Sequence, residues 1–157
     1  IMANTQAMCS SFKRELFNGE HQFGSPTLVS RTSLTAPTAD TFRFALFLAT
    51  ATINASTTTY STTGELAGTG NYTQGGVTAT FIAPTLDGTT AHTTPNASLS
   101  WTNLTSSGAF DCALCYNDTQ GDKAVAAFTF SSQNVTAANF SLTMPTNNGT
   151  TGLLRIA

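Results

Sequence analysis

The chain has 157 residues, the size of one ordinary domain with a single hydrophobic core. Only 9% of its residues are charged and the formal net charge is −2, so binding driven by nucleic-acid phosphates or by anionic lipid is not expected. Hydrophobic residues make up 40% of the chain and include 11 Phe, which supplies the apolar area that disordered chains lack.

The first predicted element is a short amphipathic helix between residues 4 and 17. Apolar side chains recur at Met8, Phe12 and Leu16, one helical turn apart. Two residues can serve as N-cap and one glycine can end the helix: Asn4 or Thr5, and Gly19. The first eleven residues are mixed and polar, which predicts no secretory signal, and no apolar run is long enough to cross a bilayer.

Residues 24–39 carry Pro26 and Pro37 and follow neither the helical nor the strand period, which predicts an extended loop, with a short strand near Leu28 as an option. From residue 40 the apolar period becomes two, as in half-buried strands. Seven segments are predicted to be strands: Thr41–Leu48, Thr78–Ile82, Ser98–Leu104, Ala109–Tyr116, Ala124–Phe130, Asn139–Met144 and Gly152–Ile156.

The clearest hairpin turn is predicted at residues 117–122, between two apolar runs and with Gly121 inside it. No helical pattern recurs between the strands, which argues against a parallel sheet. We therefore expect a mainly β chain: an antiparallel β-sandwich or jelly-roll-like domain over residues 40–157, preceded by an N-terminal helix or arm (1–23) and the extended loop (24–39).

The middle segment, residues 50–76, is rich in threonine and glycine. Tyr60, Leu66 and Tyr72 interrupt it as anchors would, so we predict loops over the sheet edge rather than a linker. Its glycines are not preceded by a strand and followed by a helix, as a phosphate-binding loop requires, and are interpreted as turn residues.

The three cysteines are Cys9, Cys112 and Cys115, and an odd number does not suggest a disulfide framework. Cys112 and Cys115 form a C-x-x-C pattern within a predicted strand, where residues three apart point to opposite faces and cannot share a metal ion. We interpret them as buried thiols.

Candidate catalytic groups are few and scattered, and we expect no enzyme activity, no cofactor and no metal. Asp87, Asp118 and Asp122 lie in turn segments, where Asp commonly bonds its own backbone, and His21 and His92 belong to no recognisable motif. Roughly eight Asn residues begin N-x-Ser/Thr triplets; we interpret these as polar strand and turn surfaces, with glycosylation as the alternative.

Several short motifs resemble one family, the small virion structural proteins of tailed bacteriophages, including cyanobacterial phages. The motifs are Met2-Ala-Asn-Thr-Gln, Cys9-Ser-Ser-Phe-Lys with Leu16, Gly19, His21 and Phe23, Asp40-Thr-Phe, Ala45-Leu-Phe, Thr59-Tyr, Gly64-Glu, Gly68-Thr-Gly-Asn-Tyr, Gly75-Gly, Ala113-Leu-Cys-Tyr-Asn, Lys123-Ala-Val-Ala and Arg155-Ile-Ala. The sequence departs from the family pattern in its long run from Gly24 to Ala39, in Asn71 and in Asp111-Cys112. The resemblance implies a non-enzymatic component of the virus particle.

The leading hypothesis is a capsid decoration, or cement, protein. It would be made in the host cytoplasm and bind the outer capsid surface, with the major capsid protein as partner and as a homo-oligomer, a trimer or dimer. The expected docking or oligomer surface is Met8, Phe12, Leu16 and Phe17; alternatively, the same apolar face packs on the domain's own sheet.

Three alternatives remain. The first is a tail, tail-fibre or head-to-tail component. The second is a carbohydrate-binding host-attachment module, which would use Trp101 or exposed tyrosines as stacking platforms, although Trp101 is expected to be buried. The third is a small hydrolase.

Overall fold

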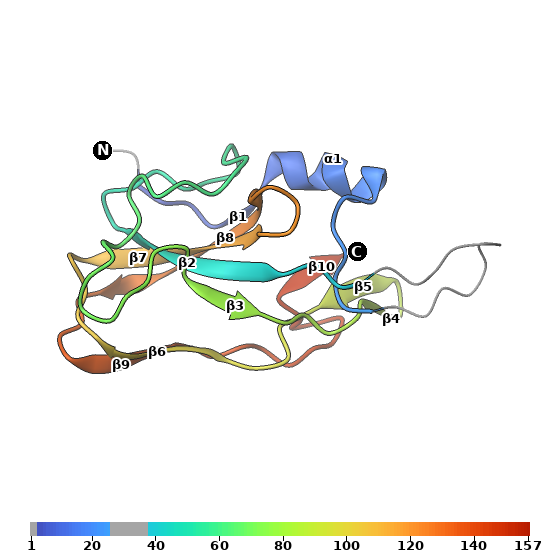
Figure 1. Cartoon of the computed structure of the whole chain (residues 1–157). Coiled ribbons are helices and arrows are strands. Elements are labelled where there is room, and N and C mark those ends of the chain that lie inside the picture. The colour runs from blue at the N-terminus through green and yellow to red at the C-terminus, as the bar shows by residue number, and fades with distance from the viewer. Residues whose placement is uncertain (1–2, 26–37) are drawn as a thin grey trace.

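A computed structural model describes residues 3–25 and 38–157 of the chain (Figure 1). One helix and ten strands follow one another in these ranges: β1 (Ala7–Met8), α1 (Ser10–Asn18), β2 (Phe42–Leu48), β3 (Val77–Ala79), β4 (Thr85–Asp87), β5 (Thr90–Thr93), β6 (Leu99–Leu104), β7 (Phe110–Asn117), β8 (Lys123–Gln133), β9 (Ala138–Leu142) and β10 (Leu154–Ile156). The fold is mainly β with one short N-terminal helix, as the sequence predicted.

The strands form three sheets in which every neighbouring pair is antiparallel. The largest has five strands in the order β1-β8-β7-β2-β3, and the others are β10-β5-β4 and β6-β9. Figure 1 shows the two smaller sheets along one side of the five-stranded sheet and α1 beside the start of β8. This arrangement is consistent with the expected β-sandwich.

Aromatic side chains fill the core between the sheets. Phe42 and Phe44 of β2 contact Phe81, with ring centroids 5.0 and 6.4 Å apart respectively. Phe110 of β7 meets Phe140 of β9 edge-on at 5.0 Å. Since β2 and β7 lie in the interior of the five-stranded sheet, their apolar runs are buried on both faces, which explains why they are nearly continuous rather than alternating.

All seven predicted strands are present, with ends shifted by a few residues, and the predicted hairpin turn joins β7 to β8. Gly121 adopts the left-handed φ of +69° that the turn requires. The hairpin of β4 and β5 was not predicted. Its signal was Gly88, because Gly88 and Thr89 form the two-residue turn between the paired Asp87 and Thr90, and a positive φ at the first turn position favours glycine.

The predicted start of the helix is wrong: α1 begins at Ser10, and neither Asn4 nor Thr5 caps it. The backbone of Ala7 and Met8 pairs with β8 instead. The Asn4 amide holds the arm against the sheet, since its Nδ2 donates to Asp111 Oδ1 at 2.7 Å and its Oδ1 accepts the Ile53 N–H at 2.8 Å. The predicted stop is confirmed, because Gly19 ends α1 in the left-handed conformation.

The middle segment follows the sheet edge as predicted. Beyond the end of β3, residues 64–66 run along β2, where Leu48 N–H donates to the Gly64 carbonyl and Leu66 N–H to the Leu46 carbonyl. The expected anchors are covered, since Leu66 and Tyr72 are buried and Tyr60 is half-buried. Most of the predicted loop at 24–39, with the possible strand near Leu28, lies outside the described residues.

Candidate functional site

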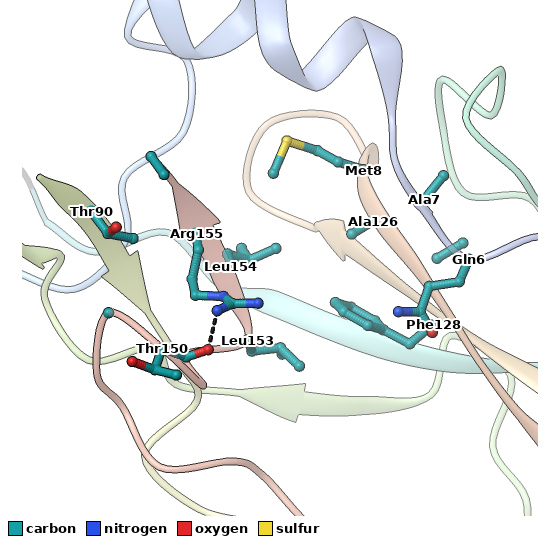
Figure 2. Close-up of a pocket in the computed structure, with 13 residues that line it drawn as sticks. Gln6, Ala7, Met8, Thr90, Ala126, Phe128, Thr150, Leu153, Leu154 and Arg155 are labelled. Carbon is teal, nitrogen blue, oxygen red and sulfur yellow. Dashed lines mark hydrogen bonds between the residues drawn. The ribbon is translucent and has the colours of Figure 1, made fainter.

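An open groove of about 710 Å³ lies between β10 on one side and β1 and β8 on the other (Figure 2). Most of the side chains that line it are apolar and come from all three strands and the residue before β10: Met8, Ala126, Phe128, Leu153 and Leu154. Phe128 of β8 lines this groove and stays half-buried, although its ring stacks on that of Phe44 with centroids 6.0 Å apart.

Among the described residues that line the groove, Arg155 has the only charged side chain. It is exposed, and its guanidinium donates to the Thr150 carbonyl, as Figure 2 shows. Among the described residues it has no carboxylate within ion-pair distance. The groove therefore combines apolar side chains with polar groups such as Gln6 and Thr90, and Arg155 lies at its rim.

Strand alternation divides the side chains of β10 between its two faces. Arg155 points to the face opposite Ile156, which is 54% exposed. Ile156 borders a second hollow of about 520 Å³ with Met8, Lys13 and Leu16. Hence β10 borders two hollows, one shared with α1 beside Ile156 and the larger groove beside Leu154, and Arg155 lines both.

The residues predicted to form a docking surface differ in their exposure to solvent. Phe12 is only 2% exposed and packs edge-on against Phe23, so it contributes to the chain's own core. Met8 and Leu16 are half-buried and line the hollow beside Ile156. The side chain of Phe17 is not among those described.

Sequence reasoning missed Phe128, Arg155 and Ile156 as surface residues. Phe128 and Ile156 lie at apolar positions of strands, where the period alone predicts burial. The signal that does exist is Arg155, a charge between two apolar residues of a short last strand, a pattern typical of an edge strand.

A buried polar network ties α1 to the sheet. Glu15 is 2% exposed, and its Oε2 lies 2.7 Å from Nε2 of His21. Asn117 Nδ2 donates to His21 Nδ1 at 3.0 Å and to Asp40 Oδ2 at 2.7 Å. Lys123 bonds both Glu20, at 2.8 Å, and the other oxygen of Glu15, at 3.5 Å. These groups satisfy one another and present no nucleophile to a cavity.

A second buried carboxylate, Glu65, accepts hydrogen bonds from the hydroxyls of Tyr60 at 2.6 Å and Tyr72 at 2.7 Å, and from the Gly75 N–H at 2.8 Å. Burial, and then the negative charge of Glu65, raises the pKa of Tyr72 well above its ordinary value. Both tyrosines therefore stay neutral hydrogen-bond donors at physiological pH, and the cluster joins the middle segment to β2.

The aromatic platforms considered for sugar binding are covered. Trp101 is 4% exposed, as predicted, Tyr72 and Tyr116 are buried and Tyr60 is half-buried. The indole Nε1 of Trp101 has no hydrogen-bond partner in the described structure.

All three thiols are free and buried. Cys112 lies opposite Phe47 and Cys115 lies opposite Phe44 on the neighbouring strand. Because residues three apart in a strand point to opposite faces, the two thiols lie on opposite faces of the sheet. Burial is the main cause that raises their pKa values, to about 12 for Cys112. Within residues 3–25 and 38–157, no cluster of three or more His, Cys, Asp or Glu side chains could hold a metal ion.

No helix in the described ranges has the length and hydropathy needed to cross a bilayer. Comparison of the chain with protein-family models, curated proteins and solved structures finds no match.

Proposed function

We propose that this chain is a non-enzymatic structural component of a phage virion, and most specifically a decoration protein that binds the outer face of the capsid shell. Its partner is the major capsid protein, and it acts as a homo-oligomer. The proposal joins the family resemblance of the sequence to the open apolar surface around β10.

The observation that carries the proposal is the exposure of large apolar side chains around β10. Ile156 is 54% exposed beside Met8 and Leu16, and Leu86 of the same sheet is 70% exposed. Apolar groups gathered at a hollow favour contact with another protein surface, because burying them removes apolar area from water. The polar networks of Glu15 and Glu65, by contrast, are internal and satisfied.

The first test is the copy number of the chain in purified particles, measured by quantitative mass spectrometry against the major capsid protein. A ratio near parity is expected for a protein that covers the shell. A few copies per particle would instead assign the chain to the tail or the head-to-tail junction. Absence from the particle would contradict any virion role.

The second test asks whether the β10 surface makes the contact. Ile156→Asn removes an exposed apolar side chain and should leave the fold intact. Its rebinding to particles that lack the protein should weaken about tenfold, since burying such a side chain contributes on the order of 1.5 kcal/mol. Ile82→Asn is the matched control, because Ile82 is 38% exposed and lines neither hollow. Equal rebinding of both variants would exclude this surface.

A further inference from the structure

The groove beside β10 has an open strand edge along one side. β10 is the last strand of its sheet and pairs only with β5. Figure 2 shows its other edge bordering the groove that Phe128 and Met8 line. The backbone groups along this edge have no strand partner among the described residues, and such an edge can pair with another extended chain.

The side chains around this edge define what the pairing chain would carry. Leu153, Leu154 and Arg155 all line the groove. Leu153 and Phe128 offer an apolar surface, whereas Arg155 offers an exposed cation that no carboxylate of residues 3–25 and 38–157 pairs with. An extended chain with apolar side chains and one carboxylate on the same face complements all three features.

The single positive charge of Arg155 and the free backbone groups of β10 argue against a nucleic acid or a lipid surface as the molecule that binds in the groove. One exposed arginine is too little to hold a nucleic-acid backbone, where affinity depends on many neutralised phosphates. A lipid surface would leave the backbone groups of β10 unused. A peptide backbone, by contrast, supplies hydrogen-bond donors and acceptors with the spacing of a strand edge.

We propose that the groove binds an extended, acidic and apolar segment of a partner protein, which adds a strand to β10 and places a carboxylate against Arg155. This inference rests on the proposed function, in which the partner is another virion protein, and it names the mode of contact. The partner's apolar side chains pack on Phe128 and Leu153.

The probe is a synthetic peptide, Val-Thr-Asp-Thr-Val-Thr-Val, acetylated and amidated, and the matched peptide with Lys in place of Asp. Each is titrated into the ¹⁵N-labelled full chain while the amide shifts of residues 154–156 are followed. The Asp peptide should shift these amides and bind up to about fivefold more tightly than the Lys peptide, the range of an exposed ion pair. Arg155→Glu should reverse the order of the two peptides.

A second variant keeps the native arginine. Thr150→Glu places a carboxylate beside Arg155, because Thr150 is exposed and its carbonyl accepts the guanidinium bond. It should remove the preference for the Asp peptide and leave the spectrum otherwise folded. Thr102→Glu, on the exposed side of β6, is the matched control and should bind like the native chain.

Three results would overturn the inference: no shift at residues 154–156 at millimolar peptide, a peptide preference that ignores Arg155→Glu, or self-association in sedimentation that Arg155→Glu abolishes. The last would make a second copy the occupant. The result of the peptide titration can be distinguished from the result of the copy-number measurement that tests the proposed function. A chain abundant in particles that does not discriminate the peptides refutes only this inference, while discrimination by a chain absent from particles refutes only the virion role.

Discussion

Asn117 shows how one side chain can determine the state of its neighbours. Its Nδ2 group can only donate, so His21 Nδ1 accepts, which leaves Nε2 as the ring nitrogen that meets Glu15. The second Nδ2 hydrogen goes to Asp40. Asn117 is fully buried, so the loss of its amide leaves His21 Nδ1 without its donor, whereas Asp40 Oδ2 keeps the hydrogen bond from the Gln22 N–H.

Asn117→Leu should therefore lower the free energy of unfolding by about 1–3 kcal/mol, since the branching of the side chain is kept but His21 Nδ1 loses its donor and the Gln120 N–H loses its acceptor. Urea denaturation followed by circular dichroism measures the change. Asn96→Leu is the control, because Asn96 is exposed, and its change should stay within about 0.5 kcal/mol. Equal effects of the two substitutions would mean that the network adds nothing to stability.

At the scale of elements, the approach of β3 to β2 depends on Gly76. Its φ is +68°, and an added Cβ would overlap the carbonyl oxygen of Phe44. The same turn presents the carbonyls of Gly75 and Gly76 to the Arg43 guanidinium, at 3.0 and 2.9 Å. A single glycine thus sets the spacing that lets β3 pair with β2.

Gly76→Ala and Gly121→Ala separate this close contact from the cost of a positive φ. Gly121 has a φ of +69° but no heavy atom within 4 Å of an added Cβ, so its substitution should cost only about 1–2 kcal/mol. Gly76→Ala should cost clearly more, above about 3 kcal/mol, because backbone must move. Thermal denaturation of both variants measures the loss of stability. Equal losses would contradict a close contact between Gly76 and the Phe44 carbonyl.

At the scale of the whole molecule, the core keeps its ionisable thiols and phenols protonated. Burial raises the pKa of Cys9 from its ordinary 9.0 to about 11, with a smaller contribution from the charge of Glu15. It likewise raises the pKa of Tyr116 to about 12. Above pH 9 the unfolded chain therefore releases protons that the folded chain still holds, and stability falls as the pH rises.

The free energy of unfolding should accordingly decline between pH 9 and pH 11, the interval between the ordinary and the raised pKa of Cys9. Each buried thiol contributes at most about 1.4 kcal/mol per pH unit. Urea titrations across this interval measure the slope, and Cys9→Ala should make it shallower. A stability that is constant to pH 11, or a slope unchanged in Cys9→Ala, would contradict the assignment.

The amino-acid sequence determined the local structure of this protein. Alternating apolar residues indicated seven of the ten strands, and glycine and asparagine identified the turn at 117–122, because strand period and turn chemistry are local properties. The same local signals predicted the end of α1 at Gly19. Gly88 was a further turn signal, from which the hairpin of β4 and β5 could have been predicted.

Only the tertiary structure decided which apolar residues are core and which are surface. The spacing of Met8, Phe12 and Leu16 is the same whether a helix packs on its own sheet or on a partner, and pairing of Met8 with β8 moved it out of the helix altogether. Likewise, Ile156 is exposed on the last strand of its sheet, and Phe128 is half-buried because an open groove separates β8 from β10. Coverage depends on contacts between segments far apart in the chain, and no local pattern of residues contains that information.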